Sequence, residues 1–113
     1  MIYEVITTCQ ADNDLKGIYE YIAFELLSPD NAVRQLERLE EHMIRLEEFP
    51  EKFKAYEKEP WHSRGMRVMP VDSYLVFYIL DKDAGIVTII RVMYAGRNID
   101  NQLNNHTIMQ KTK

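Results

Sequence analysis

Residues 64–99 hold three runs that are typical of β-strands, and this segment constrains the fold more than any other. The runs are Met66–Val71, Tyr74–Leu80 and Ile86–Tyr94. They are rich in Val, Ile, Phe and Tyr, which favour the half-buried surface of a sheet. Only short connections separate the runs, which predicts antiparallel pairing. The middle run is apolar at seven consecutive positions, so we expect it to form the central strand.

Two helical patterns precede these strands. The first places apolar residues on one helix face, at Leu15, Ile18, Tyr19, Ile22 and Leu26. Asp12 or Asn13 is available as its N-cap, with Asp14 in the positive first turn. Ser28 and Pro29 predict the start of the second helix, because proline is favoured at the first helical position. Its apolar seam consists of Ala32, Leu36, Leu39, Met43 and Leu46. Such a seam suits packing against an antiparallel neighbour, so we expect an αα-hairpin.

The predicted fold class is therefore α+β, in one domain at residues 1–100. An N-terminal strand at Ile2–Ile6 and the αα-hairpin precede a three-stranded antiparallel meander, and the strands form one sheet with the hairpin packed on one face. Residues 50–63 contain two prolines and no clean period, which predicts a connection with at most a short helical turn. Residues 101–113 form a polar tail, whose end we expect to be frayed or ordered only by a partner.

Composition favours a cytoplasmic protein without metal or cofactor. No apolar run approaches the roughly 20 residues of a membrane span, and residues 1–9 lack the features of a signal peptide. Cys9 is the single cysteine and cannot form an internal disulfide, which agrees with a reducing compartment. No spacing of Cys, His and carboxylates indicates a metal site, and no glycine-rich phosphate loop is present.

The net charge of −4 hides a division between the two halves of the chain. Residues 1–51 hold twelve acids and four bases, a sum of −8, whereas residues 52–97 hold five acids and eight bases, a sum of +3. Residues 98–113 add +1 and complete the total of −4. A polyanion could therefore meet the sheet half despite the global sign, although the acidic helices could equally be ordinary solvated faces.

The arginines of the strand segment require a partner, because a guanidinium stays charged and tolerates burial only beside a compensating group. One interpretation is a concave sheet face on which Arg67, Arg91 and Arg97 attract a phosphate. The alternative is that Arg91 forms an internal ion pair with an acid at the edge of the core, such as Glu4 or Asp81.

Tyr94 and His62 are the other candidate catalytic side chains. In an uninterrupted final strand, one face carries Val87, Ile89, Arg91 and Met93, and the other carries Ile90, Val92 and Tyr94. Arg91 and Tyr94 would then point apart unless a kink near Gly96 brings them together. Tyr94 could orient a ribose hydroxyl or serve only as packing. His62 suits acid–base chemistry near neutral pH, but a lone loop histidine is commonly a plain surface residue.

The ordered set of elements closely resembles the RelE/ParE superfamily, the toxins of bacterial type II toxin-antitoxin modules. The resemblance rests on the runs MRVMPVDSYLVFY and TIIRVMYAGRNI and on the preceding strand and hairpin, from about residue 2 to residue 100. It implies a cytoplasmic toxin, of the plasmid stabilisation type, that a cognate antitoxin chain wraps and neutralises. It also implies one of two targets, which are DNA gyrase for ParE-type members and ribosome-bound mRNA for metal-independent endoribonuclease members.

One position separates these two branches. The ribonuclease members usually carry an arginine directly after the tyrosine of the central strand, whereas this chain has Leu75 after Tyr74. Without that arginine the usual site lacks a group that stabilises charge on the scissile phosphate. The sequence is therefore closer to the ParE branch, and a gyrase-directed toxin is the favoured expectation. A ribosome-dependent endoribonuclease is the alternative, and a degenerate toxin that only holds its antitoxin is a third.

Overall fold

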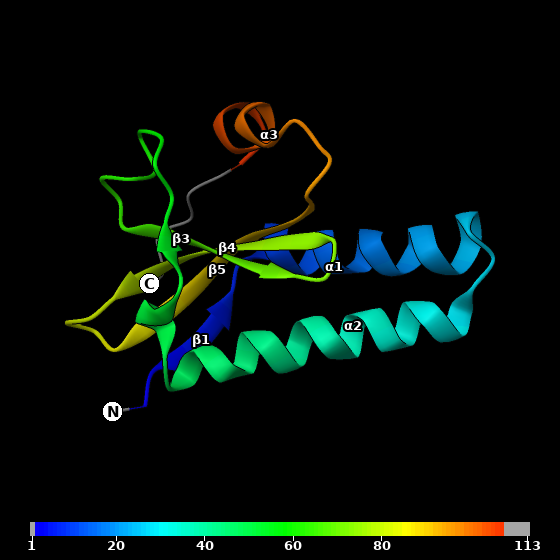
Figure 1. Cartoon of the computed structure of the whole chain (residues 1–113), viewed down its shortest axis with the longest axis horizontal. Helices are drawn as coiled ribbons and strands as arrows, with labels where there is room; N and C mark the ends of the chain where they lie inside the picture. Colours follow the sequence, from blue (N-terminus) through cyan, green and yellow to red (C-terminus); the bar gives the residue numbers. More distant parts are fainter. Residues whose placement is uncertain (1, 108–113) are drawn as a thin grey trace.

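The computed structural model describes residues 2–107, which form one five-stranded sheet between a helical hairpin and a short C-terminal helix (Figure 1). The elements, in chain order, are β1 (Glu4–Thr7), α1 (Cys9–Glu20), the π-helix η1 (Tyr21–Glu25), α2 (Pro29–Ile44), the 3-10 helices η2 (Arg45–Glu47) and η3 (Pro50–Lys52), β2 (Lys54–Ala55), β3 (Met66–Val71), β4 (Tyr74–Asp81), β5 (Ile86–Tyr94) and α3 (Ile99–Asn105).

The sheet has the strand order β1-β5-β4-β3-β2, with β4 in the centre as predicted. Strand β1 pairs parallel with β5, and every other pair is antiparallel. The predicted α+β architecture is confirmed, and β2 is an additional strand within the segment that we expected to be a connection. Its two residues pair with β3 opposite Val68 and Arg67.

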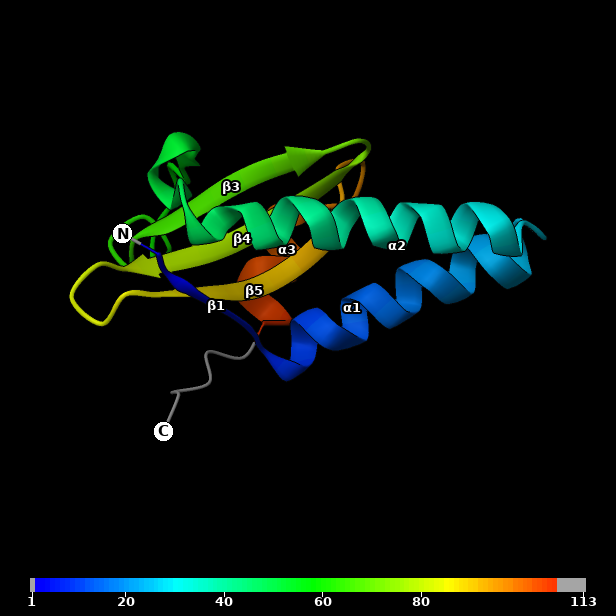
Figure 2. The same ribbon diagram turned by 90° about the horizontal axis from the view of Figure 1, so that it is seen from below.

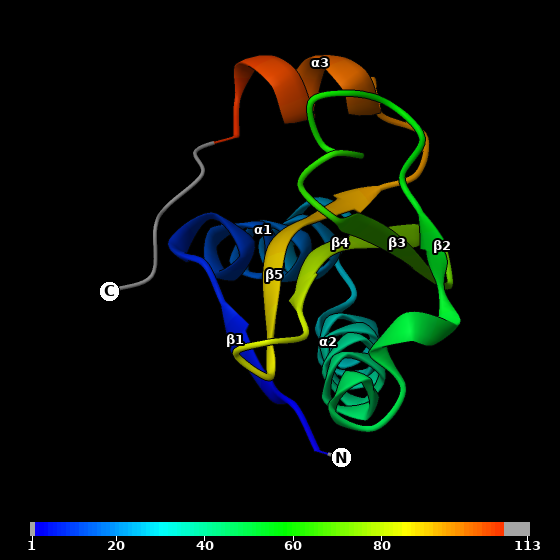
Figure 3. The same ribbon diagram turned by 90° about the vertical axis from the view of Figure 1, so that its left-hand side faces the viewer.

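The two faces of the sheet carry separate cores (Figure 3). On one face, the hairpin buries Leu39 and Met43 against sheet residues that include Val76 and Ile89. This confirms the predicted packing of the hairpin on one face. On the other face, α3 buries Leu103 in a cluster with Trp61, Met66, Phe77 and Met93. The burial of a leucine that is only 1% exposed shows why α3 forms.

The segment after residue 100 is therefore helical at its start, rather than a tail. The predicted boundary at residue 100 falls inside α3, because Ile99 and Leu103 lie one helical turn apart and both join the second core. Asn98 caps the helix by accepting a hydrogen bond from the backbone N–H of Asn101 at 3.2 Å. The predicted fraying of the chain end falls on residues 108–113, which lie outside the described part.

The N-cap of helix α1 lies four residues before the first predicted cap. Neither Asp12 nor Asn13 is the N-cap, because Thr8 takes an extended backbone (φ −77°, ψ 162°) and its Oγ1 accepts a hydrogen bond from the Ala11 N–H at 3.1 Å. Asp14 consequently lies beyond the first turn, where its carboxylate is free to meet the sheet. Helix α2 begins at Pro29 as predicted, although its N-cap Ser28 makes no side-chain capping hydrogen bond.

A β-bulge interrupts β5, and it changes which residues share a face. Phe77 lies opposite Arg91 and Tyr78 lies opposite Ile89, so Ile90 is the extra residue without a cross-strand partner. The Ile90 carbonyl accepts a hydrogen bond from Thr8 Oγ1 at 3.0 Å, which satisfies a group that the bulge would otherwise leave unpaired. The expectation that Ile89 and Arg91 share a face is therefore wrong, because the irregularity lies at Ile90 instead of Gly96.

Candidate functional site

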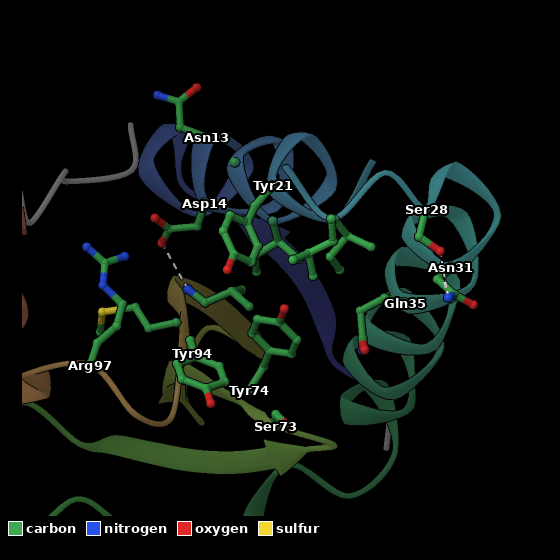
Figure 4. A pocket seen from close by; sticks show the side chains of 16 residues that line it. Asn13, Asp14, Tyr21, Ser28, Asn31, Gln35, Ser73, Tyr74, Tyr94 and Arg97 are labelled. Carbon is green, nitrogen blue, oxygen red and sulfur yellow. Dashed lines mark hydrogen bonds between the residues drawn. The ribbon is translucent and has the colours of Figure 1, made fainter. Parts of the chain in front are cut away.

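A groove of about 1140 Å³ separates the hairpin from the ends of β4 and β5 (Figure 4). Its walls come from α1, η1 and the first turns of α2 on one side, and from the sheet and the turn after β5 on the other. The lining residues are Asn13, Asp14, Gly17, Ile18, Tyr21, Ile22, Leu26, Ser28, Asn31, Gln35, Ser73, Tyr74, Val92, Met93, Tyr94 and Arg97. Figure 4 shows Tyr21 facing the sheet from the helical wall, with Arg97 at the opposite end from Ser28.

The groove exists because β1 is shorter than β5. Strand β1 ends at Thr7, opposite Ile89, and the chain then turns away into α1. Beyond that point the edge of β5 lacks a neighbouring strand, and Asp14 of α1 replaces it by accepting a hydrogen bond from the Val92 N–H at 3.0 Å. The last residues of β5 thus face the helical hairpin across the groove.

Two tyrosines form the floor of the groove. Tyr74 and Tyr94 are cross-strand partners, and their rings meet edge to face with centroids 6.0 Å apart at 71°. Burial raises the pKa of Tyr74, and the nearby Tyr94 and Tyr21 raise it further. Tyr74 is therefore a neutral phenol at physiological pH and can donate a hydrogen bond. Tyr94 is 53% exposed and presents its ring to an incoming partner.

Gly96 lets the chain pass closely over Tyr94. A Cβ atom at position 96 would lie 2.5 Å from Tyr94 Cε2, a distance that side chains cannot tolerate. The backbone N–H of Arg97 returns to the Tyr94 carbonyl at 3.1 Å. This tight turn brings Tyr94 and Arg97 to the same groove, so the structure unites these two predicted site residues.

Arg91 is one of the predicted site residues that do not line the groove. Its side chain is 6% exposed and donates to both carboxylate oxygens of Asp14, from Nε at 2.6 Å and from Nη2 at 2.9 Å. Its Nη1 donates to the His106 carbonyl at 3.1 Å and to Thr107 Oγ1 at 3.0 Å. The alternative interpretation of Arg91, an internal ion pair, is thus the one observed, although its acid is Asp14 instead of Glu4 or Asp81.

Arg67 and His62 also lie outside the groove. Arg67 is level with Tyr78 whereas Arg91 is level with Phe77, so the two arginines point to opposite faces of the sheet. Arg67 Nη1 donates to the carbonyls of Phe53 at 2.7 Å and Glu51 at 3.3 Å, which ties the connection to β3.

His62 lies in the turn before β3 with its side chain 53% exposed, and its Nδ1 is 3.7 Å from Glu59 Oε2. The three arginines thus do not converge on one surface, and Arg97 is the one that remains at the groove.

Sequence reasoning identified Tyr94 and Arg97 at the groove but missed Tyr21 and Tyr74 as lining residues. The register of β4 and β5 did not reveal Tyr74, because Asp81 lies opposite Ile86 and an unbroken ladder would place Tyr74 opposite Met93. The bulge at Ile90 shifts it to Tyr94. Tyr21 offered no sequence signal either, since its position follows from the path of the helical hairpin over the sheet.

Comparison with known proteins decides the family. The family described as the ParE toxin of the type II toxin-antitoxin system, parDE, matches residues 5–99, which is most of the chain. The chain belongs to this ParE toxin family. No curated protein was found to match the sequence. This ParE-family chain is thus a toxin of the RelE/ParE superfamily, in agreement with the resemblance noted from its strands.

Solved structures of toxin-antitoxin systems share the fold of this ParE-family chain. The chromosomal ParDE system from P. aeruginosa is similar with a TM-score of 0.67 at 18% identity, covering 82% of this chain and 96% of that one. The RelBE2 complex from Mycobacterium tuberculosis is similar with a TM-score of 0.64 at 23% identity, covering 83% and 92%. A mutant of E. coli toxin RelE in the free state gives 0.59 at 15% identity, covering 88% and 90%.

Two classes of feature are missing from the part of this ParE-family chain at residues 2–107. None of the helices described there has the length and apolar character needed to cross a membrane. Within the same residues, no group of three His, Cys, Asp or Glu side chains is placed to hold a metal ion.

Proposed function

We propose that this ParE-family toxin arrests bacterial growth by poisoning DNA gyrase when it is free of its antitoxin, as expected for a plasmid stabilisation module. The observation that carries the proposal is that few side chains in the groove could act as catalytic groups. Arg97 is the single cation among the lining residues, and none of them is a histidine. The lining carboxylate, Asp14, is already bound by Arg91 and by the Val92 N–H.

Cleavage of RNA by its own 2′-hydroxyl needs a base, an acid and positive charge on the phosphate. Tyr74 is a neutral phenol, and Leu75, at the position where ribonuclease members of the superfamily usually have arginine, packs in the second core on the other face of the sheet and does not line the groove. The groove thus offers binding surface in place of a complete cleavage site. Inhibition of a protein target requires only such a surface.

A metal-independent, ribosome-dependent endoribonuclease remains the second candidate, and one observation favours it. Tyr94 is exposed beside Arg97 at the end of β5, so a phenol and a guanidinium are available to one ligand. If the chain cuts mRNA in the ribosome, we expect these two side chains to act on the ribose and the phosphate.

The cognate antitoxin is the expected partner of the groove. The structures of related systems named RelBE2 and RelE-RelB are toxin-antitoxin complexes, which supports such a partner here. The exposed rings of Tyr21 and Tyr94 suit the apolar face of an amphipathic antitoxin segment. A carboxylate on that segment would face Arg97.

The test uses purified toxin with DNA gyrase and supercoiled plasmid. We expect linear plasmid to accumulate when the reaction is stopped with detergent and protease, because a poisoned gyrase holds cleaved DNA. In a parallel translation reaction with ribosomes, primer extension on the mRNA should show no new ends. New ends within codons, without trapped DNA, would overturn the gyrase assignment in favour of the endoribonuclease.

Variants connect the result to the groove. Arg97→Ala should weaken the arrest of growth at least about tenfold, because it removes the one cation that a ligand in the groove can reach. Arg64→Ala is the matched control, since Arg64 is an exposed arginine that stacks over Trp61 at 5.2 Å, outside the groove. If neither the wild type nor any variant arrests growth without a neighbouring antitoxin, the chain is a degenerate toxin that serves only as an antitoxin-binding module.

A further inference from the structure

The tip of the helical hairpin exposes three apolar side chains, two of which lie outside the groove. Phe24, Leu26 and Leu27, here called the tip patch, are 65%, 56% and 82% exposed. Figures 1 and 2 show the connection between η1 and α2 at one end of the molecule, beyond the edge of the sheet. Phe24 and Leu27 do not line the groove. Exposed apolar groups gathered at a projecting end commonly mark an interaction surface.

Leu27 is unusual in both its backbone conformation and its exposure. Its backbone has φ 54°, in the left-handed region that leucine rarely adopts and that glycine usually fills after a helix. Its side chain is also the most exposed of the large apolar side chains in the described residues. The left-handed conformation costs free energy, and packing of the exposed side chain within the protein does not offset this cost. A strained residue with no internal benefit is a candidate for function.

The hairpin holds this residue in place. The Leu26 N–H donates to the Tyr21 carbonyl at 3.0 Å, and the Ser28 N–H donates to the Ile22 carbonyl at 3.0 Å, so Leu27 is fixed between two backbone hydrogen bonds. Below the tip, Ile22, Ala23 and Ala32 form a small buried core between the two helices. Phe24 packs edge to face on Tyr19 with centroids 6.5 Å apart at 83°. The tip patch is therefore presented on a supported turn.

The surroundings of the tip patch are acidic. Residues 17–33 contain three acids and no base, with Lys16 and Arg34 directly outside this range. The acids are Glu20, Glu25 and Asp30, and all three are exposed. A complementary partner would present an apolar socket with Lys or Arg around its rim. This charge pattern disfavours nucleic acid as the occupant and favours a protein surface.

We propose that the tip patch is the surface through which the toxin docks onto its target, with Leu27 inserted in a basic-rimmed apolar socket of that protein. The inference rests on the proposed function, under which the target is DNA gyrase. It adds the projecting end of the hairpin to the contact surface for the target, alongside the groove with Arg97, which the antitoxin would cover in the neutralised complex.

The first test removes the anchor without straining the backbone. Leu27→Gly suits φ 54°, so its melting temperature should be no lower than that of the wild type. Trapping of gyrase-cleaved plasmid should nevertheless need at least about tenfold more toxin, as is common for a central interface anchor. Leu27→Met should retain activity because it keeps the apolar bulk. Ile44→Ala is the matched control, since Ile44 is 59% exposed at the far end of α2 and should change nothing.

The second test addresses the charged rim. Glu25→Lys should reduce trapping about fivefold, because the new ammonium meets a basic socket. Glu40→Lys changes the net charge equally but lies further along α2, so it should have little effect. Equal effects of the two substitutions would contradict a docking site at the tip.

Other outcomes separate this proposal from the proposed function. If Leu27→Gly traps gyrase as well as the wild type, docking at the tip is wrong while the gyrase assignment stands. If the wild type arrests growth without trapping gyrase, the gyrase assignment is wrong, and loss of arrest in Leu27→Gly would still support docking at the tip. A wild-type dimer that Leu27→Gly dissociates in gel filtration would instead identify the tip patch as a contact between copies of this chain.

Discussion

Arg91 illustrates how a charge inside a strand can be structural. Asp14 receives two of its hydrogen bonds and the chain near His106 and Thr107 receives the others, so this guanidinium joins α1, β5 and the segment after α3. The sequence indicated that Arg91 needs a partner, but it could not identify Asp14. The two residues are 77 positions apart, and only the tertiary fold makes them neighbours.

Removing the Asp14 charge should therefore destabilise the protein. Asp14→Asn leaves Arg91 buried without a counter-ion, and we expect the free energy of unfolding to fall by about 3–5 kcal/mol in urea denaturation. Glu20→Gln on the same helix is the control and should change stability by less than about 0.5 kcal/mol, because Glu20 is exposed. An Asp14→Asn protein as stable as the wild type would contradict this role.

Arg91→Ala distinguishes the two interpretations of the arginine. A variant that unfolds supports the buried ion pair. A variant that melts like the wild type but no longer arrests growth would instead support Arg91 as a site residue.

Tyr78 provides a pH-dependent test of burial at a single residue. Burial raises its pKa to about 12, with Arg67 opposing the shift, and its hydroxyl donates to the Pro50 carbonyl at 2.5 Å. In the unfolded chain the pKa is about 10, so only the unfolded state ionises between these two values. The contribution of the buried, protonated Tyr78 to the free energy of unfolding is therefore fully present below pH 10. It falls by about 2 kcal/mol as the pH rises to 12.

The measurement is the urea midpoint between pH 9 and pH 12, followed in the wild type and in Tyr78→Phe. The phenylalanine variant should show a shallower alkaline loss, because it has no hydroxyl to ionise at this position. Identical pH profiles of the two proteins would exclude Tyr78 as a source of the loss.

The elements of the sheet were largely predictable, whereas its irregularities were not. Strands β3 and β5 begin and end where the apolar runs predict, and β4 extends one residue further, because residues that suit a pleated sheet fill each run. No comparable sequence pattern predicts the bulge at Ile90. It depends on Thr8, 82 positions earlier in the chain, and it moves Arg91 to the face occupied by α3.

Thr8 should thus contribute more to the free energy of unfolding than its neighbour Thr7. Thr8→Val is nearly isosteric but leaves the Ile90 carbonyl and the Ala11 N–H without their partner, so we expect a loss of about 1–3 kcal/mol in unfolding free energy. Thr7→Val is the matched control, because the Thr7 hydroxyl binds Asp12 at the exposed surface. Equal losses in the two variants would show that the bulge does not depend on the Thr8 hydroxyl.

Helix α3 and the groove show the same limit at the level of elements. The segment around Ile99 and Leu103 reads as polar, and only the second core on the sheet gives its two apolar residues a place to pack. Tyr94 and Arg97 were identified from the sequence, but their union with Tyr21 requires the hairpin to cross above the end of β5. Local patterns therefore predicted the strands, and tertiary packing determined the site.

At the scale of the whole molecule, the protein carries two candidate interaction surfaces. The acidic hairpin carries the tip patch at one end, and the groove lies where the hairpin meets the sheet. Under the proposed function, a chain of net charge −4 inhibits a protein complex through these surfaces and needs no basic nucleic-acid footprint. Under this account the chain inhibits a protein and does not cut RNA.

The most direct test is one culture in which the toxin is induced without antitoxin, with DNA and mRNA ends mapped in parallel. The account predicts new double-strand DNA ends at gyrase sites within minutes of induction, with the gyrase protein attached to them, and no new mRNA ends inside codons. Codon-phased mRNA cleavage with intact chromosomal DNA would contradict it.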